Sequence, residues 1–327
     1  MSVKARVVRF AQPGGPDVLK METVDLPDPA AGEVQIRQSA IGLNYQDVYM
    51  RSGAYPMQMP SGIGGEAAGV VTKVGAGVAG FKEGDRVCYY GGPIGAYAEL
   101  RNITAERVLK LPAGVTEEQA AASLLKGMTV EYLMNRCYAV KPDQFVLFYA
   151  ASGGVGLLAG QWGKHLGARM IGVAGGADKC KLARDNGYEF VIDRTREDIA
   201  ARVKEITGGA GVPVAYDSVG KATFDATLKS LSPRGYFVSF GATTGAPPAV
   251  EAGLLQKMGS LYFTRPTLVT YTASRAEYEA SAGALFDLLG KGVLKLSINQ
   301  RYPLSDAARA HTELEAGRTI GSSVIVP

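Results

Sequence analysis

Residues 144–156, QFVLFYAASGGVG, decide the fold of the middle of this 327-residue chain. The first seven residues are nearly all apolar, as in a strand buried on both faces of a parallel sheet. A glycine-rich turn follows at residues 151–156, and the segment LLAGQWGKHLGA (157–168) then predicts a helix. A strand that runs through a glycine turn into a helix is the beginning of a βαβ unit.

The turn has the form G-x-G-x-x-G, with Ala151 in the place of the first glycine. A small residue at that place permits the tight turn, Gly153 lets backbone N–H groups approach a pyrophosphate, and Gly156 lets the helix pack closely on the strand. The N-terminus of the helix favours the negative charge of phosphates. The spacing predicts a dinucleotide site, and the alternative is a tight turn with a purely structural role.

Strands and helices alternate after this turn, which is typical of an α/β domain with a doubly wound parallel sheet. We predict strands at 169–175, 188–193 and 235–241, with helices between them. Before it, residues 4–111 carry short β-branched and aromatic runs between Gly and Pro breaks, which indicates a small β-barrel or sandwich. The terminal strand, GSSVIVP, is expected to rejoin this first domain.

The composition excludes several classes of protein. The net charge is +4 without any long run of like charges, so we do not expect a dedicated nucleic-acid or membrane-surface binder. Three scattered Cys residues fit a reducing, cytoplasmic compartment, and only two His residues argue against a His-rich metal site. The N-terminus is too charged for a signal peptide, and no apolar run is long enough to span a membrane.

The residues after the second predicted strand indicate which dinucleotide binds. An NAD site carries an acid about 20 residues after the glycines, but this strand ends in Ala174-Gly175-Gly176. Lys179 and Arg194 are two cations that suit a 2′-phosphate, so we expect NADPH. Alternatively, both are solvated charges at helix ends. Asp178 is expected to cap the next helix rather than to contact a ribose.

Seven further motifs, in order across both predicted domains, resemble those of the zinc-independent medium-chain dehydrogenase/reductases, in the quinone oxidoreductase (zeta-crystallin-like) family. The resemblance covers essentially the whole chain. Its motifs are GLNYQD (42–47), GEAAGVV (65–71), VGAGV (74–78), FKEGDRV (81–87), YDSVG (216–220), SFG (239–241) and RTIGSS (318–323).

This resemblance implies a GroES-like β-barrel catalytic domain at residues 1–124 and 293–327, interrupted by a Rossmann NADP-binding domain at residues 125–292. It also implies a homodimer. Residues 259–266 agree with this, because SLYFTR predicts an edge strand that could pair with its own copy around Leu261–Arg265.

The chain departs from the zinc-dependent branch of the resembled family. Asn44 stands where that branch has its first Cys, and the stretch before Glu66 lacks the usual His. The four-Cys lobe of a structural zinc is also missing. We therefore expect no metal. Without a Lewis acid, a conjugated acceptor such as a quinone is easier to reduce than an ordinary alcohol is to oxidise.

The resemblance also implies a set of site residues. Expected to hold NADPH are Asn44, Thr129, Ser152, Gly153, Gly154, Val155, Gly175, Lys179, Arg194, Ser218, Phe240, Gly241 and Arg318. Family members often have Tyr where this chain has Arg194. Arg194 is therefore assigned to the 2′-phosphate only because it carries a positive charge.

Tyr49 and Tyr55, with Asn44, match family positions that line the substrate pocket. The two rings could stack on a flat substrate or donate a hydrogen bond to its oxygen, or they are half-buried loop aromatics without such a role. Asp47 is a weaker candidate for a polar contact with substrate. Thr129 is a weaker candidate for the same contact.

Four other residues have plainer expectations. We expect His311 to be a surface histidine and His165 to be structural. Cys88 fits a small core residue. Glu66 is expected to orient backbone near the site, with no partner that the sequence can name.

Three functions compete at this stage. The leading one is an NADPH-dependent quinone oxidoreductase that works without a metal, and the alternative is an NADPH-dependent reductase of enone or alkenal double bonds. A third is a nucleic-acid-binding or crystallin-like role, which some relatives have on the same scaffold. No stripe of basic and aromatic residues supports nucleic-acid binding.

Overall fold

The computed structural model describes residues 2–327, and the chain divides into two compact units. Unit 1 extends to Leu125 and resumes at Leu296, and unit 2 is the segment Lys126–Lys295 between them. The first boundary falls inside helix α2 (Glu117–Glu131). Unit 2 is therefore an insertion into the chain of unit 1.

Unit 1 is built mainly from strands. A three-stranded sheet has the order β2-β1-β4, and a seven-stranded sheet has the order β15-β16-β3-β5-β6-β8, with β7 also paired to β3. The strands are β1 (Ser2–Phe10), β2 (Lys20–Pro27), β3 (Glu33–Leu43), β4 (Ser61–Gly62), β5 (Glu66–Val74), β6 (Arg86–Tyr90), β7 (Leu100–Thr104), β8 (Val108–Lys110), β15 (Ile298–Pro303) and β16 (Ser322–Val326).

The helices of unit 1 are few. Besides the first part of α2 they are α1 (Tyr45–Ser52) and α10 (Ala307–Glu315), with short 3-10 turns at Pro16–Val18, Ala105–Arg107 and Leu304–Asp306. The sequence reasoning missed α1 and treated its residues as a loop. Helix α2 begins after Thr116, whose hydroxyl accepts from the Gln119 N–H at 3.1 Å.

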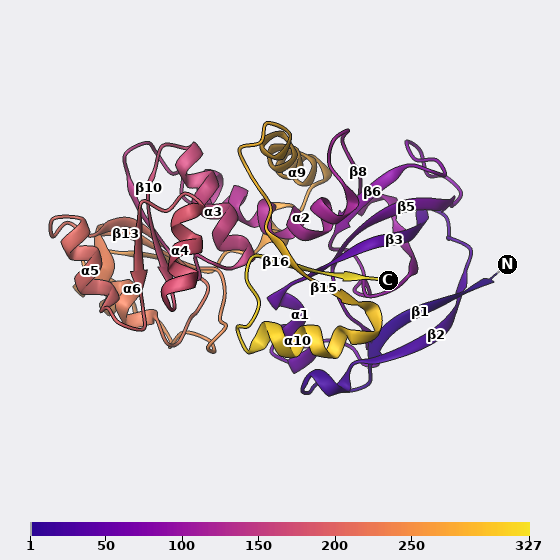
Figure 1. The fold of residues 1–327 in the computed structure, drawn as a ribbon, viewed down its shortest axis with the longest axis horizontal. Coiled ribbons are helices and arrows are strands. Elements are labelled where there is room, and N and C mark those ends of the chain that lie inside the picture. Colours follow the sequence, from indigo (N-terminus) through magenta and orange to yellow (C-terminus); the bar gives the residue numbers. More distant parts are fainter. Residues whose placement is uncertain (1) are drawn as a thin grey trace. The chain divides into compact units, whose positions relative to one another are not determined.

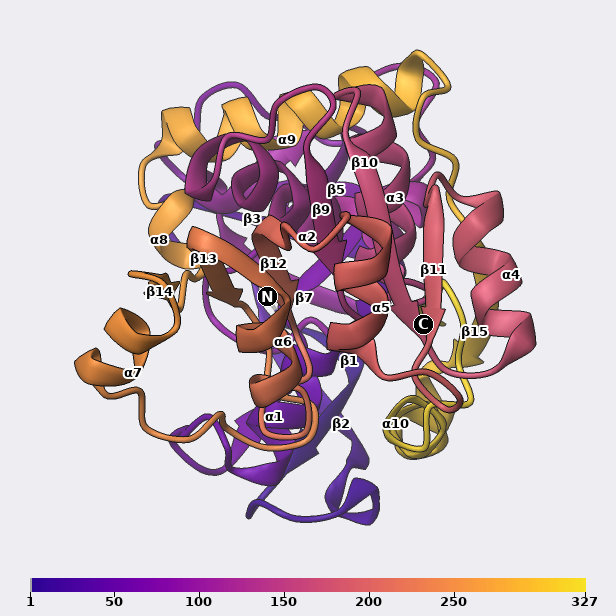
Figure 2. The same ribbon diagram turned by 90° about the vertical axis from the view of Figure 1, so that its left-hand side faces the viewer.

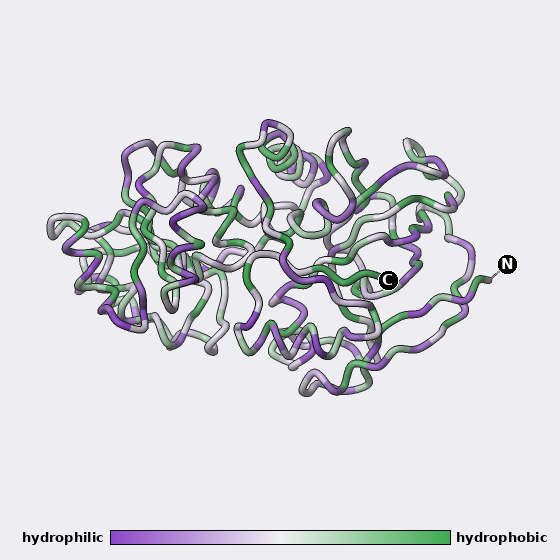
Figure 3. Tube along the Cα trace, in the orientation of Figure 1, coloured by the Kyte–Doolittle hydropathy of each residue, from purple (hydrophilic) through white to green (hydrophobic). Residues whose placement is uncertain are grey.

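The last strand of the chain confirms the predicted return to the first domain. β16 pairs antiparallel with β3, with Val324 opposite Gly42. The side chains of Val324 and Ile325 are fully buried, so the apolar end of the chain is held by the burial of these side chains as well as by the ladder. Figure 3 shows this hydrophobic end, and it also shows β1 alternating between hydrophilic and hydrophobic residues.

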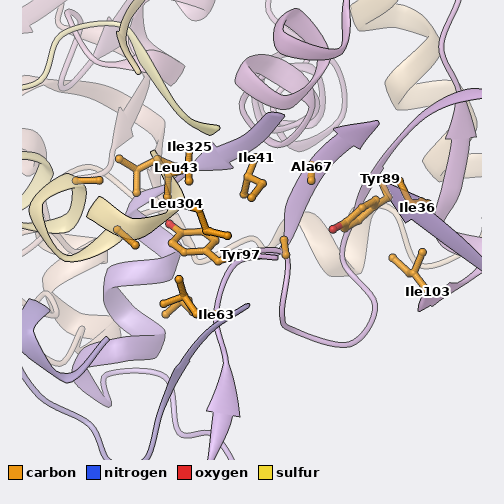
Figure 4. Packing of buried hydrophobic residues seen from close by; sticks show 14 of the residues in the cluster. Ile36, Ile41, Leu43, Ile63, Ala67, Tyr89, Tyr97, Ile103, Leu304 and Ile325 are labelled. Atoms are coloured by element: carbon orange, nitrogen blue, oxygen red, sulfur yellow. The ribbon is translucent and has the colours of Figure 1, made fainter. Parts of the chain in front are cut away.

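The core of unit 1 gathers side chains from most of its strands. Ile36, Ile41 and Tyr89 come from β3 and β6, while Tyr97 and Leu304 come from connecting segments. All five are at most 2% exposed, and Figure 4 shows them among their neighbours.

Unit 2 is the predicted doubly wound sheet. Its six strands are all parallel and have the order β11-β10-β9-β12-β13-β14. In chain order this is 3-2-1-4-5-6, the arrangement of the Rossmann fold. The strands are β9 (Phe145–Phe148), β10 (Arg169–Ala174), β11 (Phe190–Asp193), β12 (Val212–Asp217), β13 (Leu231–Ser239) and β14 (Tyr262–Thr264).

Helices cover both faces of this sheet, which explains why its central strands are apolar on both sides. Figure 1 shows α3 and α4 on one side and α5 and α6 on the other, and Figure 2 views the sheet with α5 and α6 in front. The helices of unit 2 are α3 (Gly154–His165), α4 (Ala177–Asp185), α5 (Ile199–Ile206), α6 (Phe224–Ser230), α7 (Ala252–Lys257), α8 (Leu268–Tyr271) and α9 (Arg275–Gly290), and a π-helical turn at Tyr132–Cys137 follows α2.

The strand predicted at the edge of this sheet is present but short. β14 pairs only with β13, with Phe263 beside Phe237, so its other side is an edge of the sheet. No helix in the described residues 2–327 is long and apolar enough to cross a membrane.

Candidate functional site

The glycine turn after β9 has the close packing that its fingerprint predicts. A Cβ added to Gly156 would lie 2.2 Å from the carbonyl oxygen of Ala150 and 2.7 Å from the Cα of Ala151. Only glycine fits there, so Gly156 lets the start of α3 pack closely against the turn that follows β9.

The tight bend itself falls one residue earlier than predicted. Ala150 has a φ of +52°, in the left-handed region that an L-residue rarely adopts. Ala151 instead is buried, donates its N–H to the carbonyl of Val173 at 3.0 Å, and would be only 2.8 Å from a Cβ on Gly172. The small side chain of Ala151 is therefore needed for packing against β10, while Ala150 makes the turn.

The residues at the start of α3 fit a pyrophosphate. The helix begins at Gly154 with Gly153 as its N-cap and no side chain capping it, and the first helical bond is donated by Leu157. A Cβ on Gly153 would meet only the Ala150 carbonyl, at 3.3 Å. Space therefore remains beside the first N–H groups of the helix, where the helix dipole favours an anion. Ser152, Gly153, Gly154 and Val155 all belong to this turn.

The ends of β10 and β11 bring Arg194 beside Gly175. The guanidinium of Arg194 lies 3.2 Å, through its Nε and Nη2, from where a Cβ on Gly175 would be. The Arg194 N–H donates to the carbonyl of Ala174 at 3.0 Å. Arg194 is exposed, so its charge is available beside the glycine. Lys179, partly buried, stands in the first turn of α4.

One prediction at this end of the sheet is wrong. Asp178 does not cap α4, because the N-cap is Gly176, whose φ of +87° turns the chain sharply into the helix. Asp178 lies exposed in the first turn. There its charge still complements the helix dipole, which explains why an acid follows the glycines without acting as a cap.

The carboxyl ends of β12 and β13 bring together three more expected residues. A Cβ on Gly241 would be 2.5 Å from the carbonyl oxygen of Ser218, and the Phe240 N–H donates to the carbonyl of Asp217 at 2.8 Å. The Phe240 ring lies 5.5 Å from that of Phe148. These strand ends lie beside the glycine turn, where ligands bind in open α/β sheets.

Asp217 organises this loop, and the sequence reasoning did not assign it a role. Its fully buried carboxylate accepts from the N–H groups of Val219 (2.7 Å) and Gly220 (3.0 Å) and from the hydroxyls of Thr223 (2.7 Å) and Thr227 (2.8 Å). Four donors fix one carboxylate firmly. In the sequence, the signal for this role was a strand that ends in Asp and is followed by residues with hydroxyl groups.

In unit 1, Asn44 is the N-cap of α1 and is almost fully buried. Its side-chain amide donates to Oε2 of Glu66 at 2.7 Å, and Oε1 of Glu66 accepts from the N–H of Leu125 at 2.6 Å. Glu66 therefore joins the start of α1 to α2. This is the partner that the sequence could not name.

Asp47 has a structural role instead of the expected contact with substrate. It is 2% exposed, and its Oδ2 accepts from the Asn44 N–H at 2.9 Å and from the Tyr97 hydroxyl at 3.0 Å. The capping box explains this placement, because Asp47 is the third residue of α1 and reaches back to its N-cap.

Tyr49 and Tyr55 lie against each other. Their ring centroids are 5.1 Å apart, and the Tyr55 N–H donates to the carbonyl of Tyr49 at 2.9 Å. Tyr49 stands on α1, not in a loop, and Tyr55 is 42% exposed. An exposed ring beside a partly buried one is a surface on which a flat molecule can stack.

His311 contradicts the expectation of a surface histidine, since it is fully buried. Its Nδ1 lies 3.3 Å from Nη1 of Arg51, and its Nε2 lies 3.1 Å from the hydroxyl of Tyr97. A guanidinium only donates, so Nδ1 accepts and Nε2 carries the proton. Each bond of this chain is then donated in the same direction. Arg51 donates to His311, His311 donates to Tyr97, and Tyr97 donates to Asp47.

Burial, followed by the nearby charge of Arg51, lowers the pKa of His311 to about 3. Arg51 is neutralised by Glu315, with Nη1–Oε2 and Nη2–Oε1 distances of 2.8 Å. The signal missed in the sequence was the spacing of His311 and Glu315 by one helical turn, which places both on one face of α10.

The other sequence candidates are placed as follows. Thr129 lies on α2, 8% exposed, and Arg318 is exposed between α10 and β16. Cys88 is fully buried, as expected of a core residue, and its burial raises the pKa of its thiol. His165 lies exposed at the end of α3. Across residues 2–327, no group of three or more His, Cys, Asp or Glu side chains is arranged to hold a metal ion.

Comparison with known proteins identifies the family. The model of the alcohol dehydrogenase GroES-like domain matches residues 30–113, and that of the zinc-binding dehydrogenases matches residues 154–287. The chain is 47% identical to a quinone oxidoreductase of Pseudomonas aeruginosa over 99% of this chain and 100% of that relative. The chain belongs to the quinone oxidoreductase family of medium-chain dehydrogenase/reductases.

Other members of the quinone oxidoreductase family share this fold closely. The crystal structure of the Escherichia coli quinone oxidoreductase complexed with NADPH has 48% identity and a TM-score of 0.97, and covers 98% of this chain and 100% of its own. A 2-haloacrylate reductase of Burkholderia is 40% identical over 96% of each chain. These matches confirm the predicted combination of a GroES-like domain and a Rossmann domain.

Proposed function

We propose that this protein is an NADPH-dependent quinone oxidoreductase that works without a metal. The observation that carries the proposal is the fit of unit 2 to this coenzyme: an open glycine turn at the start of α3, and Arg194 beside Gly175 where NAD sites carry an acid. The full-length identity to quinone oxidoreductases, and the NADPH bound in one of them, support the same assignment.

NADPH would be held by residues that come mainly from the carboxyl ends of five strands of unit 2, namely β9, β10, β11, β12 and β13. The N–H groups of α3 bind the pyrophosphate, and Lys179 and Arg194 bind the 2′-phosphate. We assign to the coenzyme the same set expected from the sequence: Asn44, Thr129, Ser152, Gly153, Gly154, Val155, Gly175, Lys179, Arg194, Ser218, Phe240, Gly241 and Arg318. Once bound, this coenzyme supplies a hydride.

The acceptor is a flat conjugated molecule. Tyr49 and Tyr55 stack on its ring, and either hydroxyl donates a hydrogen bond to the oxygen that becomes negative as hydride arrives. Asn44 keeps the start of α1 in place through its bond to Glu66. A quinone spreads the new charge over its ring, so no Lewis acid is needed to stabilise it.

A second function is supported by one relative. A family member that is 40% identical is a 2-haloacrylate reductase, and an acrylate carries a conjugated double bond. Rates measured in parallel on a quinone panel and on short 2-alkenals decide between the two functions, since the higher kcat/KM identifies the preferred acceptor.

We also propose a cytoplasmic homodimer. The three cysteines are free, as in a reducing compartment. The outer side of β14 offers an edge that a second copy could cover by pairing strand to strand. We assign the GroES-like catalytic domain to unit 1 and the NADP-binding domain to unit 2, whose boundaries lie within three residues of those expected from the sequence.

The proposal is tested by measuring the binding of NADPH and NADH through quenching of intrinsic fluorescence, followed by the oxidation of NADPH with a panel of quinones. We expect NADPH to bind more tightly and to be oxidised with at least one quinone. Failure of every quinone to accept hydride would refute the proposed activity, whereas tighter binding of NADH would refute the coenzyme assignment.

A further inference from the structure

The carboxyl end of β11 carries an acid that the proposed coenzyme site does not include. Oδ1 of Asp193 accepts from the N–H of Gly176 at 2.9 Å, from the N–H of Thr195 at 3.0 Å and from the hydroxyl of Thr195 at 2.7 Å. Its own N–H donates to Oε1 of Glu197 at 2.7 Å. Thr195 and Glu197 therefore fix the position of Asp193, and Asp193 in turn fixes the loop that follows the neighbouring strand β10.

The bond to Gly176 fixes the start of α4. Gly176 is the N-cap of that helix, and its φ of +87° turns the chain between β10 and α4. Since its N–H points to Asp193, this N–H is not offered to a phosphate. An anion at this end of the sheet therefore depends on the side-chain cations around it, not on the Gly176 backbone.

Asp193 and Arg194, consecutive residues, clamp the loop at three successive places. The backbone N–H of Arg194 is bonded to the carbonyl of Ala174, the guanidinium lies against Gly175, and the carboxylate of Asp193 holds Gly176. Lys179 follows in the first turn of the helix that starts there. The same carboxylate also accepts from Thr195, the residue after Arg194, so it holds the backbone beside Arg194 as well as the N-cap of the helix that carries Lys179.

We propose that Asp193 is a specificity-determining positioning residue, which fixes Arg194 and Lys179 around the 2′-phosphate of NADPH. This inference rests on the proposed function, because it requires NADPH as the coenzyme. An acid next to a phosphate site would by itself repel the phosphate, but the three donors on Oδ1 offset its charge.

The ionisation of Asp193 agrees with this role. The bonds from Gly176 and Thr195 lower its pKa to about 2. The carboxylate therefore stays charged at any pH at which the enzyme is assayed, and its bonds to the loop persist across that range.

The experiment compares the dissociation constants of NADPH and NADH in the wild type and in D193A, D193N and D198A. Asp198 is the matched control, because it lies five residues further along the chain and its carboxylate likewise accepts from the backbone, here from the Ala201 N–H at 2.8 Å. Loss of Asp198 changes the net charge equally without touching the loop. Far-ultraviolet circular dichroism verifies that each variant is folded.

We expect D193A to bind NADPH about tenfold more weakly, a loss of one ordinary charge-assisted bond, while NADH binding changes less than about twofold. D193N should stay within about threefold of wild type, since its amide oxygen accepts the same N–H bonds. D198A should match the wild type for both coenzymes. The kcat at saturating NADPH should be unchanged in all three variants.

An unchanged NADPH-to-NADH ratio in D193A would overturn the inference. So would tighter NADPH binding in both D193A and D193N, because Asp193 would then act only as a repelling charge. If D193A does not fold, D193S is judged by the same ratio, since the shorter side chain cannot span to Gly176. A wild type without preference for NADPH would instead refute the proposed coenzyme, and the inference with it.

Discussion

The hydroxyl of Tyr97 lies 3.1 Å from Nε2 of His311, although 214 residues separate them in the chain. Tyr97 precedes β7 and His311 is on α10. This contact therefore joins the two chain segments that make up unit 1. Through Asp47, which accepts from Tyr97, it also reaches the cap of α1, the helix that carries Tyr49. A buried polar chain of this kind is stabilising only while every member keeps its partner.

The first prediction concerns pH. The pKa of His311 is about 3 in the folded protein, below the value of about 6.5 for an unfolded chain. The unfolded state therefore binds one more proton between these values, so His311 makes stability fall as pH falls from about 6.5 towards 3, by up to roughly 1.4 kcal/mol per pH unit. Urea unfolding of the wild type and of His311→Gln at pH 7 and pH 4.5 measures this contribution.

We expect His311→Gln to have a lower free energy of unfolding than the wild type at pH 7. At pH 4.5 the difference between the two free energies of unfolding should be smaller. The variant lacks the group that must be protonated on unfolding, while all other titrating groups are common to both proteins. A gap that stays constant with pH would show that His311 is not held neutral.

The second prediction concerns Tyr97→Phe. The change removes a donor from the buried carboxylate of Asp47 and an acceptor from His311, so we expect a loss of about 1–3 kcal/mol in the free energy of unfolding. Tyr302→Phe is the control: its hydroxyl donates to Oε2 of Glu313 at 2.6 Å, but that side chain is 32% exposed and water can replace the bond. Equal losses in the two variants would contradict a special role for the buried chain.

The third prediction concerns Gly156→Ala. The added Cβ would lie 2.2 Å from the Ala150 carbonyl, which is backbone and cannot move freely. We expect a loss of at least about 2 kcal/mol in stability, from overpacking of the turn, and NADPH binding weakened at least about tenfold.

Gly283→Ala serves as the control for that substitution. Gly283 lies inside α9, and a Cβ there would meet no atom within 4 Å. This variant should be about 0.5–1 kcal/mol more stable, because alanine is the better helix former. Thermal unfolding and an NADPH titration of both variants provide the comparison, and similar behaviour of the two would refute the packing argument.

The fourth prediction concerns the two cations. Lys179→Ala and Arg194→Ala should each weaken NADPH binding about tenfold, with NADH binding nearly unchanged, because only NADPH carries the phosphate that they bind. Lys181→Ala is the matched control, since Lys181 stands on the same helix but pairs with Asp185 at 2.6 Å. Equal weakening of both coenzymes by Lys179→Ala would mean that Lys179 does not touch the 2′-phosphate.

The fifth prediction concerns assembly. Tyr262 of the edge strand β14 is 53% exposed and stacks on Tyr236, with ring centroids 4.5 Å apart. Tyr262→Lys places a charge on this edge and should convert a dimer into a monomer, as measured by light scattering after gel filtration. Met21→Lys, on the exposed face of β2 in unit 1, should leave the mass unchanged. A dimer that survives Tyr262→Lys would place the interface elsewhere.

Local patterns were enough to predict the Rossmann unit and its coenzyme loop. An apolar strand, a glycine turn and a helix are close in sequence, so residues such as Gly153 and Gly156 have roles set by backbone geometry within one turn. The strand that ends without an acid, and the cations after it, are local in the same way. The same reasoning failed for α1, because its residues show no clear apolar periodicity.

By itself, the sequence determined the two kinds of domain, their order and the glycine turn, since each follows from spacing along a short segment. Only the tertiary structure decided the roles of Glu66, His311, Asp193 and Asp217. Glu66, His311 and, through Gly176, Asp193 bond to groups at least 17 residues away, so these bonds, and with them the pKa shift of His311, exist only after distant segments have packed together. The partners of Asp217 all follow it within 10 residues, but the carboxylate is enclosed by them only once β12 and its loop are buried.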